Sequence, residues 1–311
     1  MRKLGWNVAV VLAAGVVFSI TAAPSPARAC DRLWVAGGGL WLAQGDEVRL
    51  VASDERGVFS PRFSPAGERI VYAHEVRLDS GTRPELVVIN DAGQVLRTLT
   101  LPADSPVNAI LQTGWRDSRH VFAEGHVNPS TSQYLEWDID SGRVVDEKVG
   151  SWFAVSPNGR LLAQRANVPH GAPPPYDGST LLINDKVVYP PEGDSSYHRF
   201  MGPLVWSPDS SRVALAEHTD AATEIVVVNA TGGVATRASI ATTAPVDLSW
   251  TAPGTLMIRS GKEAWRLDAA GGKAERVPRA SISSTSVAPP TALRERVRGV
   301  KLRPEDSRCR P

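Results

Sequence analysis

The chain has 311 residues, with 34 basic and 33 acidic side chains, so its formal net charge at neutral pH is +1. A near-neutral chain with scattered charges is a poor nucleic-acid binder, which excludes that class of partner from our expectations. The length suits one large all-β domain or two small ones.

Residues 1–29 have the pattern of a secretory signal peptide. Arg2 and Lys3 give a positive start, an apolar stretch follows at 8–20, and Ala27-Arg28-Ala29 fits the small-x-small cleavage rule. Cleavage after Ala29 leaves 31 basic and 33 acidic residues, a net charge of −2. An uncleaved anchor is the alternative. We predict a secreted or periplasmic protein with no transmembrane segment after cleavage.

Cys30 would be the first residue of the mature chain, which raises the alternative of a lipid anchor. A lipobox has an aliphatic residue three places before the cysteine and a small residue two places before it. Ala27 and Arg28 stand at those places. We therefore favour the form without a lipid.

A short phrase recurs along the chain. It is an apolar residue, a Ser-Pro-x-Gly turn and a strand-forming run, as in Phe63-Ser64-Pro65-Ala66-Gly67 followed by ERIVYA. Copies begin at Trp115, Val155, Trp206 and Trp250, at spacings of 52, 40, 51 and 44 residues. Serine at the first place of a type I turn can bond the backbone two residues on, and proline and glycine suit the second and fourth places. Each phrase therefore predicts a β-hairpin.

Two more strands are expected after each hairpin. Strand-forming runs stand at 85–91, 133–140, 179–185, 223–230 and 263–270, and most end in an Asx-Gly-type turn before a fourth short strand. Four antiparallel strands in units of 40 to 52 residues are typical of propeller blades. No convincing amphipathic helix interrupts the pattern, so the sequence predicts an all-β fold.

The phrase resembles the repeat of the TolB-type propeller family, often described as WD40-like. The resemblance covers residues 30–311 and implies one six-bladed β-propeller domain. The resemblance to TolB itself would imply a separate α/β domain before the propeller, but the sequence between Ala29 and Phe63 leaves no room for one. Peptidase relatives carry a G-x-S-x-G elbow, which the sequence lacks. We therefore expect a propeller standing alone, and the resemblance implies a fold without fixing a function.

The two ends of the chain supply the predicted sixth blade. Leu302-Arg303-Pro304-Glu305-Asp306 overlays on the turn phrase at a spacing of 52 from Trp250, but its following strand is missing. Leu33–Ala36 would supply it by pairing with an inner strand near Val297–Leu302. Such strand sharing between the termini closes the ring and removes an open sheet edge.

The two cysteines, Cys30 and Cys309, fall where this sixth blade would have its inner hairpin turn. An even pair of cysteines in an exported protein is usually bridged. We predict a disulfide that replaces the missing covalent turn. Frayed termini with unpaired thiols are the alternative.

Polar residues end the second strand of several units, and equivalent positions in a propeller face a common axis or rim. These ligand-binding candidates are His74, Glu75, Glu124, His126, Arg165, Glu217, His218 and Arg259. The imidazoles of His74, His126 and His218, with adjacent carboxylates, could ligate a metal or supply a general base. A binding rim without chemistry and simple solvated strand ends are the other interpretations. His126 is offset by one residue and could face the other way.

We predict a non-catalytic, cofactor-free and monomeric module that binds a protein, peptide or glycan in the bacterial envelope or outside the cell. A lyase or lactonase that uses the His/Glu rim is the alternative. A degenerate repeat protein whose partner is encoded nearby is the third possibility. The proline-rich stretch at 170–178 could be a recognition loop or a linker. We expect Trp115, Trp206 and Trp250 to pack between blades.

Overall fold

The computed structural model describes residues 30–278, 293 and 303–309, with gaps at 46, 79–80, 129–130, 167–179, 193, 195–197 and 220. The predicted signal peptide, the proline-rich stretch and the strand expected near Val297–Leu302 lie outside the described residues. Between 30 and 278, the described residues form strands and turns without a helix. The predicted all-β fold is therefore confirmed.

The strands form five antiparallel sheets. The first has the order β23-β1-β2-β3 and the second the order β4-β5-β6-β7. Their strands are β23 (Arg303–Cys309), β1 (Cys30–Ala36), β2 (Gly39–Gln44), β3 (Glu47–Ser53), β4 (Val58–Phe63), β5 (Arg69–Leu78), β6 (Gly81–Asn90) and β7 (Val95–Thr100).

The third sheet has seven strands, in the order β14-β13-β12-β11-β10-β9-β8. They are β8 (Ala109–Trp115), β9 (His120–Val127), β10 (Thr131–Asp138), β11 (Arg143–Val155), β12 (Leu162–Arg165), β13 (Leu181–Ile183) and β14 (Lys186–Tyr189). The long strand β11 pairs with β10 up to Gly150 and with β12 from Ser151 onward. Divided there, the sheet gives two groups of four strands that share β11.

The last two sheets have the orders β15-β16-β17-β18 and β19-β20-β21-β22. Their strands are β15 (Phe200–Trp206), β16 (Arg212–His218), β17 (Thr223–Asn229), β18 (Val234–Ile240), β19 (Asp247–Ala252), β20 (Thr255–Ser260), β21 (Glu263–Asp268) and β22 (Glu275–Arg276). The predicted order of hairpin, third strand and fourth strand is thus present, while the six-blade count and the closure of the ring stay predictions.

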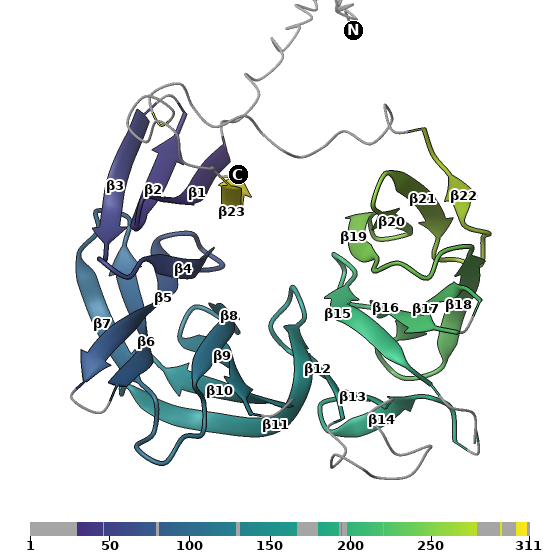
Figure 1. Ribbon diagram of the computed structural model, residues 1–311, viewed down its shortest axis with the longest axis horizontal. Helices are drawn as coiled ribbons and strands as arrows, with labels where there is room; N and C mark the ends of the chain where they lie inside the picture. The colour runs from purple at the N-terminus through teal and green to yellow at the C-terminus, as the bar shows by residue number, and fades with distance from the viewer. Residues whose placement is uncertain are drawn as a thin grey trace, which may run out of the picture.

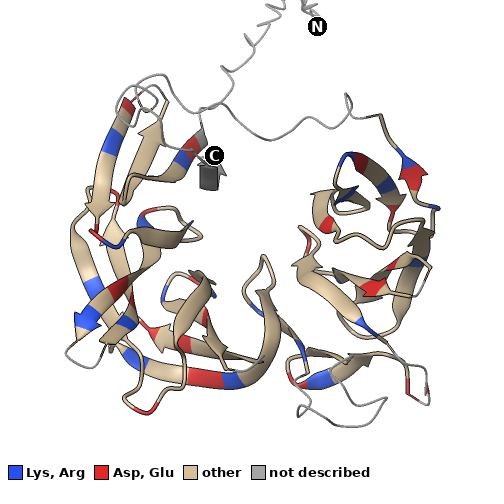
Figure 2. Cartoon of the chain, in the orientation of Figure 1, with Lys and Arg blue, Asp and Glu red and all other residues tan. Residues whose placement is uncertain are grey.

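The sheets are arranged around a common centre (Figure 1). The first strand of each group lies innermost, so that β23 contacts β4, β4 contacts β8, β11 contacts β15, and β15 contacts β19. Clusters of buried apolar side chains fill the space between consecutive sheets. Basic and acidic residues are interspersed over the sheets (Figure 2), in keeping with the near-zero net charge.

The repeated phrase forms the predicted turn. The amide of Gly67 donates to the carbonyl of Ser64 at 2.7 Å, and Gly159 and Ser210 do the same in their own copies. Gly67 has φ 74°, and Ser210 adopts φ 61° where the Phe63 and Val155 copies have glycine. The serine hydroxyls do not accept from the backbone two residues on. They accept the amide five residues on, at 3.0–3.1 Å, because that amide opens the next strand and points back across the turn.

The prediction of a sixth copy of the turn at 302–306 is wrong, because Arg303–Cys309 forms a strand there. This strand pairs with β1, with Cys30 opposite Cys309 and Val35 opposite Arg303. The two termini thus share a sheet, and the residues that pair with Leu33–Val35 lie at 303–306, beyond the predicted 297–302. Pro304 fits because β23 is the edge strand of its sheet and carries a register shift beside it.

Candidate functional site

The inner strands are interrupted by bulges at corresponding places. Register shifts occur at 59–62 in β4, 110–112 in β8, 151–154 in β11 and 201–205 in β15. Three residues in or beside these bulges have positive φ: Ser60 (52°), Trp152 (55°) and Gly202 (82°). A positive φ is easy for glycine but strained for tryptophan, and such strain gathers at functional sites. The bulged inner strands are therefore where a functional site is expected.

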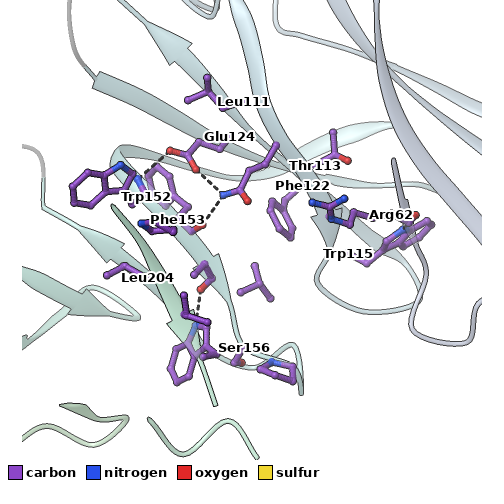
Figure 3. Close-up of a pocket in the computed structure, with 18 of the residues that line it drawn as sticks. Arg62, Leu111, Thr113, Trp115, Phe122, Glu124, Trp152, Phe153, Ser156 and Leu204 are labelled. Atoms are coloured by element: carbon purple, nitrogen blue, oxygen red, sulfur yellow. Dashed lines mark hydrogen bonds between the residues drawn. The ribbon is translucent and has the colours of Figure 1, made fainter. Parts of the chain in front are cut away.

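A pocket of about 680 Å³ lies on the bulged strands (Figure 3). Its walls come from 111–115 of β8, 152–157 at the end of β11 and 203–206 of β15, together with Arg62, Phe63, Pro65, Phe122 and Glu124. Leu111, the extra residue of the β8 bulge, is 55% exposed. Trp152 is partly exposed. The pocket is thus mainly apolar and aromatic, with few charged groups.

Glu124 organises one end of this pocket, as Figure 3 shows. Its Oε1 accepts the Trp152 amide at 3.0 Å, and its Oε2 accepts Gln112 Nε2 at 2.7 Å. Gln112 Nε2 also donates to the Phe153 carbonyl at 2.7 Å. The carboxylate and the amide side chain therefore tie β8 and β9 to the bulge of β11.

Glu124 is only 3% exposed. Burial raises the pKa of its carboxyl above the ordinary value, against hydrogen bonds from Gln112, Ser132 and the backbone of 152–153 that lower it. Burial therefore outweighs these hydrogen bonds. A buried acid with a raised pKa beside a pocket is a candidate functional group, although a purely structural network also perturbs pKa values.

Arg165 lies over the indole ring of Trp152, with its Cζ 4.7 Å from the ring centre. A guanidinium over an aromatic face is attractive. Two of the eight predicted residues, Glu124 and Arg165, are thus brought together through Trp152. We did not predict Trp152 or Gln112. A signal was present, because Ser60, Gln112 and Trp152 each stand three places before the apolar residue of their phrase.

The three histidines predicted as metal ligands lie in three different sheets, each with its own neighbours. His74 Nδ1 is 3.0 Å from Asp54 Oδ2, His126 Nε2 is 3.2 Å from Asn128 Oδ1, and His218 Nδ1 is 3.4 Å from Thr223 Oγ1. The described residues contain no group of three or more His, Cys, Asp or Glu side chains placed to hold a metal ion. The metal hypothesis stays a prediction without support from this geometry.

Glu217 belongs to a separate buried network. Its Oε1 is 3.0 Å from His198 Nδ1, and its Oε2 is 3.3 Å from Arg237 Nη1. His198 Nε2 faces Asp194 at 3.2 Å, and Arg237 Nη2 donates to the Tyr189 hydroxyl. This network joins β14 to β16 and β18. His198 stands outside the repeated phrase, which is why the sequence did not single it out.

The remaining two candidates have no described partner that suggests a ligand. Glu75 is partly exposed and stands opposite Pro84 in the β5–β6 ladder. Arg259 stands between Asp247 and Ala264, and its Nε is buried without a hydrogen-bond partner in the described part of the chain. The predicted rim is therefore not one constellation.

Three tryptophans join neighbouring inner strands in the same way. Each indole N–H donates to the main-chain carbonyl one place before the apolar residue of the preceding phrase: Trp115 to Arg62 (3.1 Å), Trp206 to Ala154 (2.8 Å) and Trp250 to Val205 (3.0 Å). They pack between consecutive sheets, as predicted. We call each of these tryptophans, with its hydrogen bond to the preceding inner strand, an indole latch. Val155 stands at the corresponding place in β11, so the β8–β11 junction, where the pocket opens, has no indole latch.

Solved structures match this arrangement at low sequence identity. An uncharacterised protein from Listeria monocytogenes matches with a TM-score of 0.53 and 11% identity over 81% of this chain and 82% of that chain. The WD40 domain of coronin from Toxoplasma gondii matches with a TM-score of 0.52 and 14% identity over 80% and 67%. TolB from Acinetobacter baumannii matches with a TM-score of 0.42 and 14% identity over 79% of this chain and 65% of that chain, a score too low to carry an argument.

The chain is a β-propeller. The predicted β-propeller fold, similar to that of WD40 domains, is confirmed, and likeness at such identity shows the fold alone. No protein-family model and no curated protein matches this propeller. Among its described residues, no helix is long and apolar enough to cross a membrane.

Proposed function

We propose that this propeller is a non-catalytic binding module that holds a segment of a partner protein at the pocket on its inner strands. The observation that carries the proposal is the partly exposed Trp152, kept at φ 55° on the pocket wall. Backbone strain at Trp152 lowers stability, and Leu111 in the same pocket is 55% exposed. Strained backbone and exposed apolar side chains of this kind are typical of binding sites.

The lining favours a protein segment over a glycan. Recognition of sugars needs several hydrogen-bonding side chains, whereas Glu124 and Gln112 are engaged with each other and with the β11 backbone. The remaining wall is largely apolar, with Phe122, Phe153 and Leu204 among its residues. Such a surface suits apolar side chains of a polypeptide, which anchor most protein interfaces.

The test begins with a random-peptide display library selected against the purified protein. The selected peptide is then titrated against wild type and against Leu111→Asp, with fluorescence anisotropy as the readout. We expect at least about tenfold weaker binding, because a charge replaces an exposed apolar contact in the pocket. Leu96→Asp is the matched control, since Leu96 is 49% exposed on the outer strand β7. Equal binding by wild type and Leu111→Asp contradicts the proposal.

We further propose that the propeller works after export, in the bacterial periplasm or outside the cell, with Cys30 and Cys309 joined in a disulfide. The predicted signal peptide supports export. The register supports the disulfide, because Cys30 and Cys309 stand opposite each other in the β1–β23 ladder. Opposed residues of an antiparallel pair have Cα atoms about 4.5–5.5 Å apart, within the range of disulfides.

Mass spectrometry tests both parts. Protein recovered from the periplasm or medium of an expressing bacterium should lack residues 1–29. Alkylation before reduction should label no thiol, and alkylation after reduction should label two. Closing so long a loop contributes about 5 kcal/mol in the chain-entropy model, so reduction should also lower the unfolding temperature. Two thiols labelled without reductant would exclude the disulfide.

A further inference from the structure

The backbone of Trp152 needs partners outside its own sheet. In the β11–β12 ladder, Ser151 stands opposite Arg165 and the next pair is Ala154 with Ala163. Trp152 and Phe153 therefore stand together against the single residue Gln164 of β12, as in a β-bulge. Buried peptide groups that leave a ladder must find other hydrogen-bond partners, and here side chains of the preceding blade supply them.

Glu124 accepts the Trp152 amide at 3.0 Å, and Gln112 donates to the Phe153 carbonyl at 2.7 Å. We propose that Glu124 is the positioning residue that holds Trp152 in the left-handed conformation and so keeps its indole on the pocket wall. The inference rests on the proposed function, since it assigns the device that prepares that binding surface.

The carboxylate suits this task better than a neutral group. A hydrogen bond to an ionised acceptor is stronger than one between neutral groups, and both oxygens of Glu124 face donors. Burial raises the pKa of Glu124 because desolvation disfavours the charged form. The stem of the side chain reaches β11 from β9, so a shorter residue would not span the same gap.

Glutamine is the informative substitution. Glu124→Gln keeps the shape of the side chain but replaces one acceptor oxygen by an NH2 group, which must then face the Trp152 amide or Gln112 Nε2. Either arrangement sets donor against donor. We expect the Trp152 amide to lose its protection from hydrogen exchange and the selected peptide to bind about tenfold more weakly, as it should to Trp152→Ala.

Glu217→Gln is the matched control. Glu217 is also a buried second-strand glutamate, 4% exposed, but it bonds His198 and Arg237 instead of a bulge. We expect this variant to leave the exchange of the Trp152 amide and the affinity for the peptide unchanged. Its effect measures what a buried Glu→Gln change does to the fold in general.

A double variant separates positioning from plain stabilisation. Glycine adopts a positive φ without strain, so Glu124→Gln should cost less stability in a Trp152→Gly background than in wild type, whereas Glu217→Gln should cost the same in both. This comparison also serves where Glu124→Gln alone folds poorly.

The outcomes distinguish the inference from the function on which it rests. Unchanged protection of the Trp152 amide in Glu124→Gln overturns the positioning role, whatever the peptide does. If the Trp152 amide loses its protection in Glu124→Gln but Trp152→Ala binds the peptide as tightly as wild type, the positioning role is supported and the pocket is overturned as the peptide site. Lost protection together with weakened binding in both variants supports the two proposals.

Discussion

The β4–β8 and β8–β11 junctions solve one problem in two ways. β8 lies between β4 and β11, and each of these two neighbours carries a bulge with a non-glycine residue at positive φ, Ser60 in β4 and Trp152 in β11. At the first junction the Thr113 amide donates to the Ser60 hydroxyl at 2.9 Å, and the Thr113 hydroxyl donates to the Ser60 carbonyl. At the second, the buried carboxylate of Glu124 holds the Trp152 amide.

The indole latch makes the second difference. Trp115 closes the β4–β8 junction by donating to the Arg62 carbonyl, whereas Val155 stands at that place in the β8–β11 junction. The pocket walls come largely from β8 and β11, the two strands whose junction lacks this latch. The candidate site thus lies where the repeat departs from its own pattern. An apolar opening replaces the latch, and the carboxyl group of Glu124 replaces the hydroxyl of Thr113.

Removing a latch should have the largest effect on stability. Trp206 is 7% exposed and donates to Ala154, so Trp206→Ala should lower the free energy of unfolding by about 3–5 kcal/mol through lost packing and an unsatisfied carbonyl. Val155→Ala, at the junction without a latch, should cost about 1 kcal/mol because Val155 is only partly buried. Urea unfolding followed by circular dichroism measures both. Equal costs would contradict the comparison.

Gly114 tests the packing behind the pocket. A Cβ on Gly114 would lie 2.4 Å from Cζ of Phe122, a buried ring in the pocket wall. We expect Gly114→Ala to cost about 1–3 kcal/mol by overpacking, measured as a lower urea midpoint. Gly254→Ala is the control, since nothing lies within 4 Å of its Cβ position, and it should be near neutral.

A second change makes this prediction sharper. If the clash with the ring is the cause, Phe122→Leu should reduce the cost of Gly114→Ala, so the two effects should be less than additive. Strict additivity would show that the alanine acts elsewhere, for example on the backbone of β8.

Much of the fold could be predicted from the sequence because it is local. The turn at Ser64-Pro65-Ala66-Gly67 depends on residues next to one another, and its copies at Ser156 and Ser207 form as expected. The place of the three latch tryptophans followed from the same phrase. The turn predicted at 302–306 is absent because a hairpin turn needs a second strand directly after it. Here the strand that pairs with 303–309 is β1, from the other end of the described chain.

The candidate site could be predicted only in part. Glu124 and Arg165 could be predicted because the repeat places a polar residue at or near the end of each second strand. Trp152 was not, because its conformation depends on a register shift between β11 and β12 and on a carboxylate from another strand. His74, His126 and His218 do not converge, since equivalent positions in separate sheets need not point to one place.

The smallest expected effect is a pH dependence that only the β8–β11 junction should show. The folded-state pKa of Glu124 is raised above the ordinary 4.5 because the group is buried. Between that value and the raised one, the folded state binds more protons than the unfolded state, so stability falls as pH rises. The stability advantage of wild type over Glu124→Gln should therefore shrink as pH rises from about 4.5. It changes by about 1.4 kcal/mol for each unit by which the pKa is raised.

Ser60→Ala is the control for this pH dependence, because the hydroxyl of Ser60 does not titrate in that range. Its cost should stay constant from pH 4 to pH 7, while the difference between wild type and Glu124→Gln declines. Urea midpoints across this range measure both. Parallel curves for wild type and Glu124→Gln would show that burial does not raise the pKa of Glu124. The chemical contrast between the two junctions would then be one of shape, with no contribution from charge.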